Sequence, residues 1–125
     1  MDTAIRRNAY GVEPALLKAM IVGGEGCSKR LSDDGFGSCG YSQALPSIRA
    51  WCGIPGSASQ SCAAIQNDIQ LDMNCTAKLI KDNGGRCGMD ARGAASCYNS
   101  GVPNNCARTT NRYCDRVQGY YNGCK

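Results

Sequence analysis

Histidine is absent from this chain of 125 residues. Its absence excludes a Ser-His-Asp or Cys-His nucleophile system, a histidine general base and a histidine-ligated catalytic zinc. An enzyme of this composition must work with carboxylates, tyrosine or lysine. Because one or two carboxylic acids suffice to cleave a glycosidic bond, carbohydrate chemistry is favoured among the enzymatic functions. Non-enzymatic functions are equally compatible with this absence.

Long apolar runs, CxxC pairs and a dense basic stripe are also missing. The longest apolar run covers only residues 19–22, far short of a membrane span, so no membrane partner is expected. Without CxxC spacing a zinc knuckle is not expected, and nothing indicates a cofactor. The net charge of +4 is spread along the chain, which argues against nucleic acid and suits an anionic polymer. The chain starts with polar residues, and we expect that a secretory leader has been removed.

Cysteine, by contrast, is abundant. The ten cysteines lie eight to thirteen residues apart, and the even count predicts five disulfides. Disulfides persist in oxidising compartments, so we expect a secreted protein, extracellular or periplasmic. The pairing cannot be deduced from the sequence. The cysteines are Cys27, Cys39, Cys52, Cys62, Cys75, Cys87, Cys97, Cys106, Cys114 and Cys124.

Helix signals dominate the chain, and strand signals are few. We therefore predict one all-α domain over residues 1–125, with an irregular lobe at residues 26–45, and we expect a monomer. With only one Phe and one Trp the core is small, which explains the need for disulfides. Helices are predicted over residues 13–25, 46–51, 62–83, 90–98 and 103–120.

Glu25 stands where the first apolar helix ends. Burial beside Met20, Ile21 and Val22 and the negative end of the helix dipole both disfavour its anion, so we expect a raised pKa. A carboxyl with a raised pKa is suited to general acid catalysis near neutral pH. The glycines around Glu25 remove bulk, which would let a polymer approach it closely.

Three motifs follow one another along the chain, at residues 12–26, 40–46 and 94–101, and they resemble those of soluble lytic transglycosylases. Residues 12–26 (VEPALLKAMIVGGEG) resemble the apolar catalytic helix that ends in a Glu-Ser pair. Residues 40–46 (GYSQALP) resemble the Gly-Leu-Met-Gln-x-x-Pro turn, and residues 94–101 (AASCYNSG) the Ala-x-Ala-Tyr-Asn-x-Gly segment. Each motif is weak alone, but together they are specific. Gly26 replaces the family's Ser, and Tyr41-Ser42 replace Leu-Met, so this part of the cleft should be more polar.

The resemblance implies a lysozyme-like fold of the transglycosylase and goose-type lysozyme kind. It implies that Glu25 is the sole acid/base cleaving peptidoglycan between N-acetylmuramic acid and N-acetylglucosamine, with a 1,6-anhydromuramyl product. Gln43 matches the glutamine that lines the cleft. Tyr98 matches a tyrosine whose hydroxyl lies near the catalytic carboxyl, and Asn99 matches an asparagine facing the sugar. Tyr41 and Ser42 are expected to contribute to substrate binding.

Two alternatives stay open. Asp34 has the spacing of an aspartate in goose-type lysozymes and could serve as the second carboxylate of a hydrolase that cuts peptidoglycan or chitin. That reading lacks a further aspartate that these lysozymes carry, because Leu45 occupies its position. The Asp33-Asp34 pair is also an ordinary loop sequence. A non-catalytic glycan-binding module on the same scaffold is the alternative of another class.

Overall fold

The computed structural model describes residues 1–32, 35–100 and 112–124. These residues form helices and loops, with two isolated β-bridges and no β-strand, so the prediction of an all-α domain is confirmed. None of the helices described combines the length and apolar character that crossing a membrane requires. The helices are α1 (Asp2–Arg6), α2 (Pro14–Lys18), η1 (Ala19–Gly24), α3 (Pro46–Trp51), α4 (Ala58–Asn67), α5 (Ile69–Cys87), α6 (Ala91–Ser100) and α8 (Arg112–Cys124).

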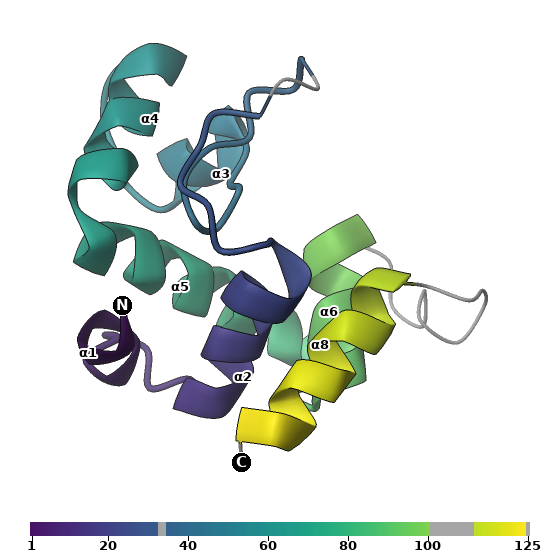
Figure 1. Ribbon diagram of the computed structural model, residues 1–125. Helices are drawn as coiled ribbons and strands as arrows, with labels where there is room; N and C mark the ends of the chain where they lie inside the picture. The colour runs from purple at the N-terminus through teal and green to yellow at the C-terminus, as the bar shows by residue number, and fades with distance from the viewer. Residues whose placement is uncertain (33–34, 101–111, 125) are drawn as a thin grey trace.

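The described helices form two groups that share α5. Helices α1, α2, α6 and α8 pack on one side of α5, while α3, α4 and the loop before α3 form a smaller lobe on the other (Figure 1). Each group has its own apolar cluster. The larger one is built from α1, α2, η1, α5, α6 and α8, and the smaller one contains Cys39, Ile54, Cys62 and Ile65.

The first predicted helix lies at the centre of the larger cluster. Leu16, Leu17, Met20 and Ile21 are all fully buried, as expected from apolar residues on most of its faces. The segment begins as α2, where Pro14 occupies the first turn, and continues as the single-turn π-helix η1. Wide turns of this kind are uncommon and occur frequently at functional sites.

The helix predicted over residues 62–83 is two helices. Asp68 leaves helical geometry (φ −137°, ψ 96°), and its side chain accepts the N–H groups of Gln70 and Leu71 at the start of α5. This N-cap separates the two helices, although the helical spacing of apolar residues continues across Asp68. The apolar stripe divides accordingly, with Ile65 in the smaller cluster and Ile80 in the larger one.

The smaller lobe is held by a buried arginine. Arg49 on α3 is 1 % exposed, and its guanidinium donates to the carbonyls of Gly37, Ala44 and Ala58 and to the Ser61 hydroxyl at 2.6–2.9 Å. These bonds join the loop before α3 to the first turn of α4. The planar, multidentate guanidinium suits this task in a lobe with few large apolar side chains.

Disulfides connect the elements of both groups. Cys39–Cys62 joins the loop to α4, Cys52–Cys75 joins the end of α3 to α5, and Cys87–Cys97 joins α5 to α6. Cys114 is also disulfide-bonded. These bridges indicate an oxidising environment.

The prediction that all ten cysteines pair is wrong at Cys27. This thiol is exposed and free, and a methionine sulfur, Met1 Sδ, lies 3.9 Å from its Sγ. With Cys27 unpaired, the nine other cysteines can form at most four bridges within the chain. Cys106 and the side chain of Cys124 lie outside the described residues.

The last two predicted helices agree with the structure where it describes them. The helix predicted over residues 90–98 is α6. The one predicted over 103–120 corresponds to α8, which begins at Arg112 and continues to Cys124; residues 103–111 lie outside the described part of the chain.

We predict that iodoacetamide labels Cys27 in the native, unreduced protein, because its thiol is exposed. Peptide mapping by mass spectrometry should find this label together with the three disulfide-linked peptides Cys39–Cys62, Cys52–Cys75 and Cys87–Cys97. The Cys27→Ser variant serves as the control and should lack the label. An unlabelled Cys27 recovered in a disulfide-linked peptide would contradict this pattern.

Candidate active site

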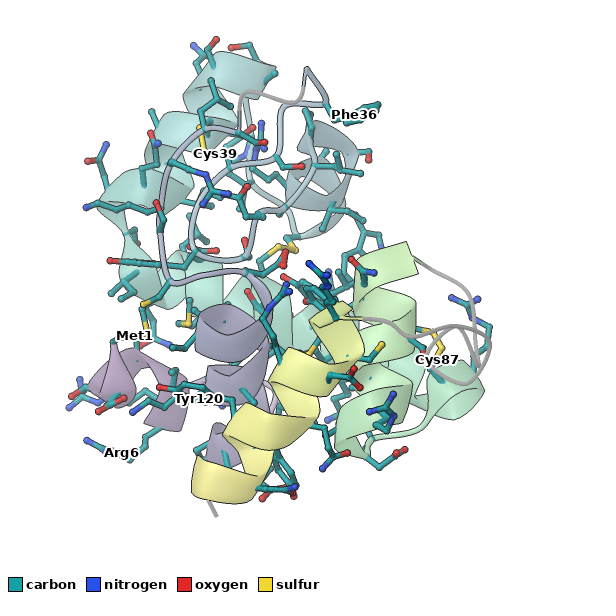
Figure 2. All side chains as sticks on the ribbon, turned by 45° about the vertical axis from the view of Figure 1, so that its right-hand side comes forward. Met1, Arg6, Phe36, Cys39, Cys87 and Tyr120 are labelled. Carbon is teal, nitrogen blue, oxygen red and sulfur yellow. A yellow bond between two sulfur atoms is a disulfide. The ribbon has the colours of Figure 1, made fainter. Side chains whose placement is uncertain are left out.

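A cleft of about 800 Å³ opens between the larger helical group and the smaller lobe. Its walls come from the end of η1, the loop before α3, α3 itself, α5, α6 and α8. Phe36 is 72 % exposed and projects from the outer edge of the lobe (Figure 2). The described residues that line the cleft are Gly24, Glu25, Arg30, Ser32, Phe36, Ser38, Ser42, Gln43, Ala44, Leu45, Ile48, Leu79, Asn83, Cys97, Tyr98, Asn99, Tyr113 and Arg116.

Glu25 lies in this cleft directly after the π-helical turn. Its backbone N–H donates to the Met20 carbonyl at 3.0 Å, which extends the wide turn by one residue. Burial raises the pKa of the Glu25 carboxyl to about 7, against a hydrogen bond from Tyr113 and the positive charges of Arg116 and Arg30, which lower it. The upward direction agrees with the sequence prediction, and its main cause is desolvation.

Helix α8 approaches η1 so closely that only glycine fits at two positions. A Cβ atom at Gly24 would lie 2.7 Å from the Tyr113 hydroxyl and ring, and one at Gly23 would lie 2.8 Å from the Tyr120 Cβ. These glycines therefore admit a helix of the protein itself, whereas the sequence suggested that they leave room for a polymer. Gly26, at φ +81°, has open space where its Cβ would be.

Close packing of α8 brings two functional side chains to Glu25. Arg116 donates to the carbonyls of Gly23 and Gly24 at 3.0 and 3.2 Å, so its charge is held at the end of η1. Tyr113 is buried, and burial next to the charge of Glu25 raises the pKa of its phenol well above the usual range. The phenol therefore stays protonated and can donate a hydrogen bond to the Glu25 carboxylate.

Tyr98 lines the same cleft from α6, and its hydroxyl has a different hydrogen-bond partner. Its hydroxyl donates to the Ser42 carbonyl at 2.6 Å. Burial, with the charges of Glu25 and Asp72 nearby, raises the pKa of Tyr98 well above its ordinary value. The resemblance implied a Tyr98 hydroxyl close to the catalytic carboxyl. The structure places Tyr98 near Glu25, but the phenol that most lowers the pKa of the carboxyl is Tyr113.

The remaining predicted residues differ in whether they line the cleft. Gln43 lines the cleft at φ +51°, and its amide donates to the carbonyls of Arg30 and Gly40, both at 2.9 Å. Asn99 is exposed at the cleft wall. Ser42 reaches the cleft but is only 1 % exposed. Tyr41 is not part of the lining and packs against the larger apolar cluster.

Glu25 is the only carboxylate among the described residues that line the cleft. Asp33 and Asp34, the candidates for a second acid, lie outside the described residues. Across residues 1–32, 35–100 and 112–124, no group of three or more Cys, Asp or Glu side chains could hold a metal ion. The chemistry available from the described lining is that of one protonatable carboxyl with phenol and guanidinium neighbours.

The sequence reasoning missed Tyr113, Arg116 and Arg30. Tyr113 and Arg116 stand three residues apart in the predicted last helix, so they share one face of it. That spacing could have identified the pair, but not the element that the pair faces. Arg30 lies in the irregular lobe, where no periodicity indicates which side chains point into a cleft.

No protein family model, no curated protein sequence and no solved structure matches this chain.

We predict that Glu25 titrates near pH 7, as measured by NMR of its carboxyl carbon, and that Tyr113→Phe raises this midpoint because it removes a hydroxyl whose interaction stabilises the anion. Tyr121→Phe is a matched control on the same helix, since the Tyr121 hydroxyl donates to Glu13. It should leave the midpoint unchanged. A wild-type midpoint near 4.5 would contradict the burial of Glu25.

Proposed function

We propose that this protein is a lytic-transglycosylase-like enzyme with a lysozyme-like fold. It would cleave the β-1,4 bond between N-acetylmuramic acid and N-acetylglucosamine in peptidoglycan and leave a 1,6-anhydromuramyl product. The observation that carries the proposal is a single partly buried carboxyl, Glu25, with a pKa of about 7 in a cleft of about 800 Å³. The three sequence motifs support it, since Glu25, Gln43, Tyr98 and Asn99 all line that cleft.

One carboxyl suffices for both steps of this reaction. Protonated Glu25 donates its proton to the glycosidic oxygen, and the bond from the muramyl C1 to that oxygen breaks. The resulting Glu25 carboxylate then accepts the proton of the muramyl 6-hydroxyl as that oxygen bonds to C1. The net change is an internal transfer without water, and Glu25 ends protonated as it began.

The neighbours of Glu25 suit this alternation. The Tyr113 hydroxyl interacts with the carboxyl and favours its anion between the two steps. Arg116, held by two backbone carbonyls, adds positive charge in a fixed position. These two opposing influences limit the effect of burial and leave the pKa near neutrality, where an acid/base can serve in both directions.

Charge around the cleft favours an anionic glycan. Arg30 and Arg116 line it, and Glu25 is the only carboxylate in the described lining. Peptidoglycan carries carboxylates on its peptides and lactyl groups, whereas chitin is neutral. The net charge of +4 has the same sign, and the disulfides fit secretion to the compartment where cell wall is found.

We predict that Glu25→Gln abolishes the clearing of bacterial walls, with a loss of at least about 10³-fold, because a sole acid/base would serve both steps. Glycan binding should persist. Glu13→Gln is the matched control at the start of the same helical segment; it makes the same change of charge outside the cleft and should clear walls normally. Mass spectrometry of the wild-type products should find fragments lighter by one water than reducing sugars.

The same variant tests the energetic cost of the buried carboxyl. The folded-state pKa of Glu25 is raised from 4.5 to about 7, so its contribution to stability is present below pH 4.5 and is lost as the pH rises through 7. Glu25→Gln should therefore stabilise the fold above pH 7 by about 1–3 kcal/mol.

A folded Glu25→Gln protein that clears walls normally would remove Glu25 from catalysis. Wild type that binds glycan without cleaving it would identify a binding module, and reducing-end products would identify a hydrolase.

We predict that Arg30→Gln raises the KM for peptide-bearing peptidoglycan by about two- to fivefold, the effect of an exposed charge worth about 0.2–1 kcal/mol. The dependence on salt should weaken with it, while neutral chitooligosaccharides should bind as in the wild type. Lys29→Gln is the matched control, because Lys29 is the adjacent exposed cation and lies outside the cleft lining. Equal losses on neutral and anionic glycans would argue against charge recognition by Arg30.

A further inference from the structure

A second buried carboxyl lies behind the cleft. Asp72 is on the first turn of α5, is 0 % exposed and does not line the cleft. Acidic side chains are almost never fully buried unless they are paired or bonded. The reaction proposed above does not use Asp72, so its burial calls for another explanation.

Asp72 is in direct contact with the turn of residues 40–43. Its Oδ2 atom accepts the Tyr41 N–H at 2.8 Å, and the backbone and side chain of Ser42 lie close enough to favour its anion as well. A Cβ atom at Gly40, where φ is +80°, would lie 2.9 Å from the same Oδ2. A carboxylate that accepts a backbone N–H of a turn helps to fix the path of that turn, in the way that a cap fixes a helix end.

The same turn holds Tyr98. The Ser42 carbonyl accepts the Tyr98 hydroxyl at 2.6 Å, one residue after the N–H that Asp72 binds. One helical turn beyond Asp72, Thr76 donates its hydroxyl to the Asp72 carbonyl at 2.9 Å, and the Thr76 side chain lies close enough to Tyr98 to lower the pKa of its phenol. The charges of both Asp72 and Glu25 act on the Tyr98 phenol, which places Tyr98 between the two carboxyls.

We propose that Asp72 is a positioning residue of the active site. In its ionised form it would hold the turn of residues 40–43, and through Ser42 it would hold Tyr98 against Glu25. This role rests on the proposed function of Glu25. Asp72 itself would touch neither the substrate nor the reacting atoms.

A pH dependence follows from this arrangement. Burial raises the pKa of Asp72 to about 6, against the hydrogen bonds from Ser42 and Tyr41. The titratable side chain facing it from α6 is Tyr98, with Glu25 of the η1 end beyond, and no arginine or lysine among the described residues contributes to this pKa. Catalysis would need ionised Asp72 and protonated Glu25, so the rate should rise through about pH 6 and fall through about pH 7.

The stability of the fold should fall, rather than rise, as Asp72 ionises. The folded-state pKa of Asp72 lies above its unfolded value of 3.8, so its contribution to stability is present below pH 3.8 and is lost as the pH rises through 6. At neutral pH the ionised carboxyl is therefore a cost to the fold. A neutral isostere should retain or increase stability, whereas the loss of a purely structural residue would decrease it.

The test is Asp72→Asn, with Asp68→Asn as the matched control. Asp68 is the exposed N-cap of the same helix, and asparagine caps equally well. We expect Asp72→Asn to lower kcat at least tenfold at pH 6.5 with KM within twofold, to lose the acid limb near pH 6, and to keep or raise Tm at pH 7.5. Wild-type kcat with an intact acid limb would overturn the proposal, and so would a fall in Tm.

A spectroscopic measurement keeps this test separate from the activity of Glu25. With tyrosine labelled at Cζ and Tyr98 assigned by Tyr98→Phe, the wild-type Tyr98 resonance should shift in two steps, near pH 6 and near pH 7. Asp72→Asn should remove the first step, and Glu25→Gln should remove the second. A two-step profile in Asp72→Asn would overturn the role of Asp72 whether or not the protein cleaves glycan.

Ser42→Ala provides a second variant should Asp72→Asn not fold. It removes a hydroxyl whose interaction with Asp72 lowers the pKa of that carboxyl, so the step near pH 6 in the Tyr98 resonance should move to higher pH. In an active enzyme the acid limb should move with it. A step that stays in place in folded Ser42→Ala protein would contradict the coupling of Asp72 to Tyr98.

Discussion

The contact between η1 and α8 is the constraint on which the site depends. Gly23 and Gly24 let α8 lie directly on the π-helical turn, and any Cβ atom at either position would collide with it. Because of this approach, Tyr113 reaches the Glu25 carboxyl and Arg116 binds the last carbonyls of η1. The phenol and the positive charge that act on Glu25 therefore share one origin, the contact of two helices in which Arg116 binds a residue 93 positions earlier in the chain.

The smaller lobe completes the cleft and is held by different means. Its apolar cluster is small, and the Cys39–Cys62 bridge and the guanidinium of Arg49 connect its loop to α3 and α4. Cys52–Cys75 then ties α3 to α5. Polar and covalent links of this kind hold a loop where too little apolar surface is available to fold it. The lobe can thus present Gln43 and Ser42 to the larger helical group.

Local pattern was enough to predict the position of Glu25 and the helical class, because an apolar segment that ends in glycines has few other interpretations. The local pattern did not predict the features that tertiary packing determines. The break at Asp68 falls within an unbroken apolar stripe, and only the two separate clusters give it a reason. Tyr113 interacts with Glu25 where Tyr98 was expected, and this contact depends on how α8 packs on η1. The burial of Asp72 contradicts the exposure expected of a charged residue.

Two buried carboxyls in a small domain serve the proposed chemistry but reduce the stability of the fold. Glu25 and Asp72 both have pKa values raised by burial, so both anions weaken the fold at neutral pH. Bridges joining loop to α4, α3 to α5 and α5 to α6 counter this by restricting the unfolded chain. The elements so joined are those that carry the cleft: α5 with Asp72, α6 with Tyr98, and the loop with Gln43. Stability from the disulfides would thus allow charge to be buried where the proposed chemistry requires it.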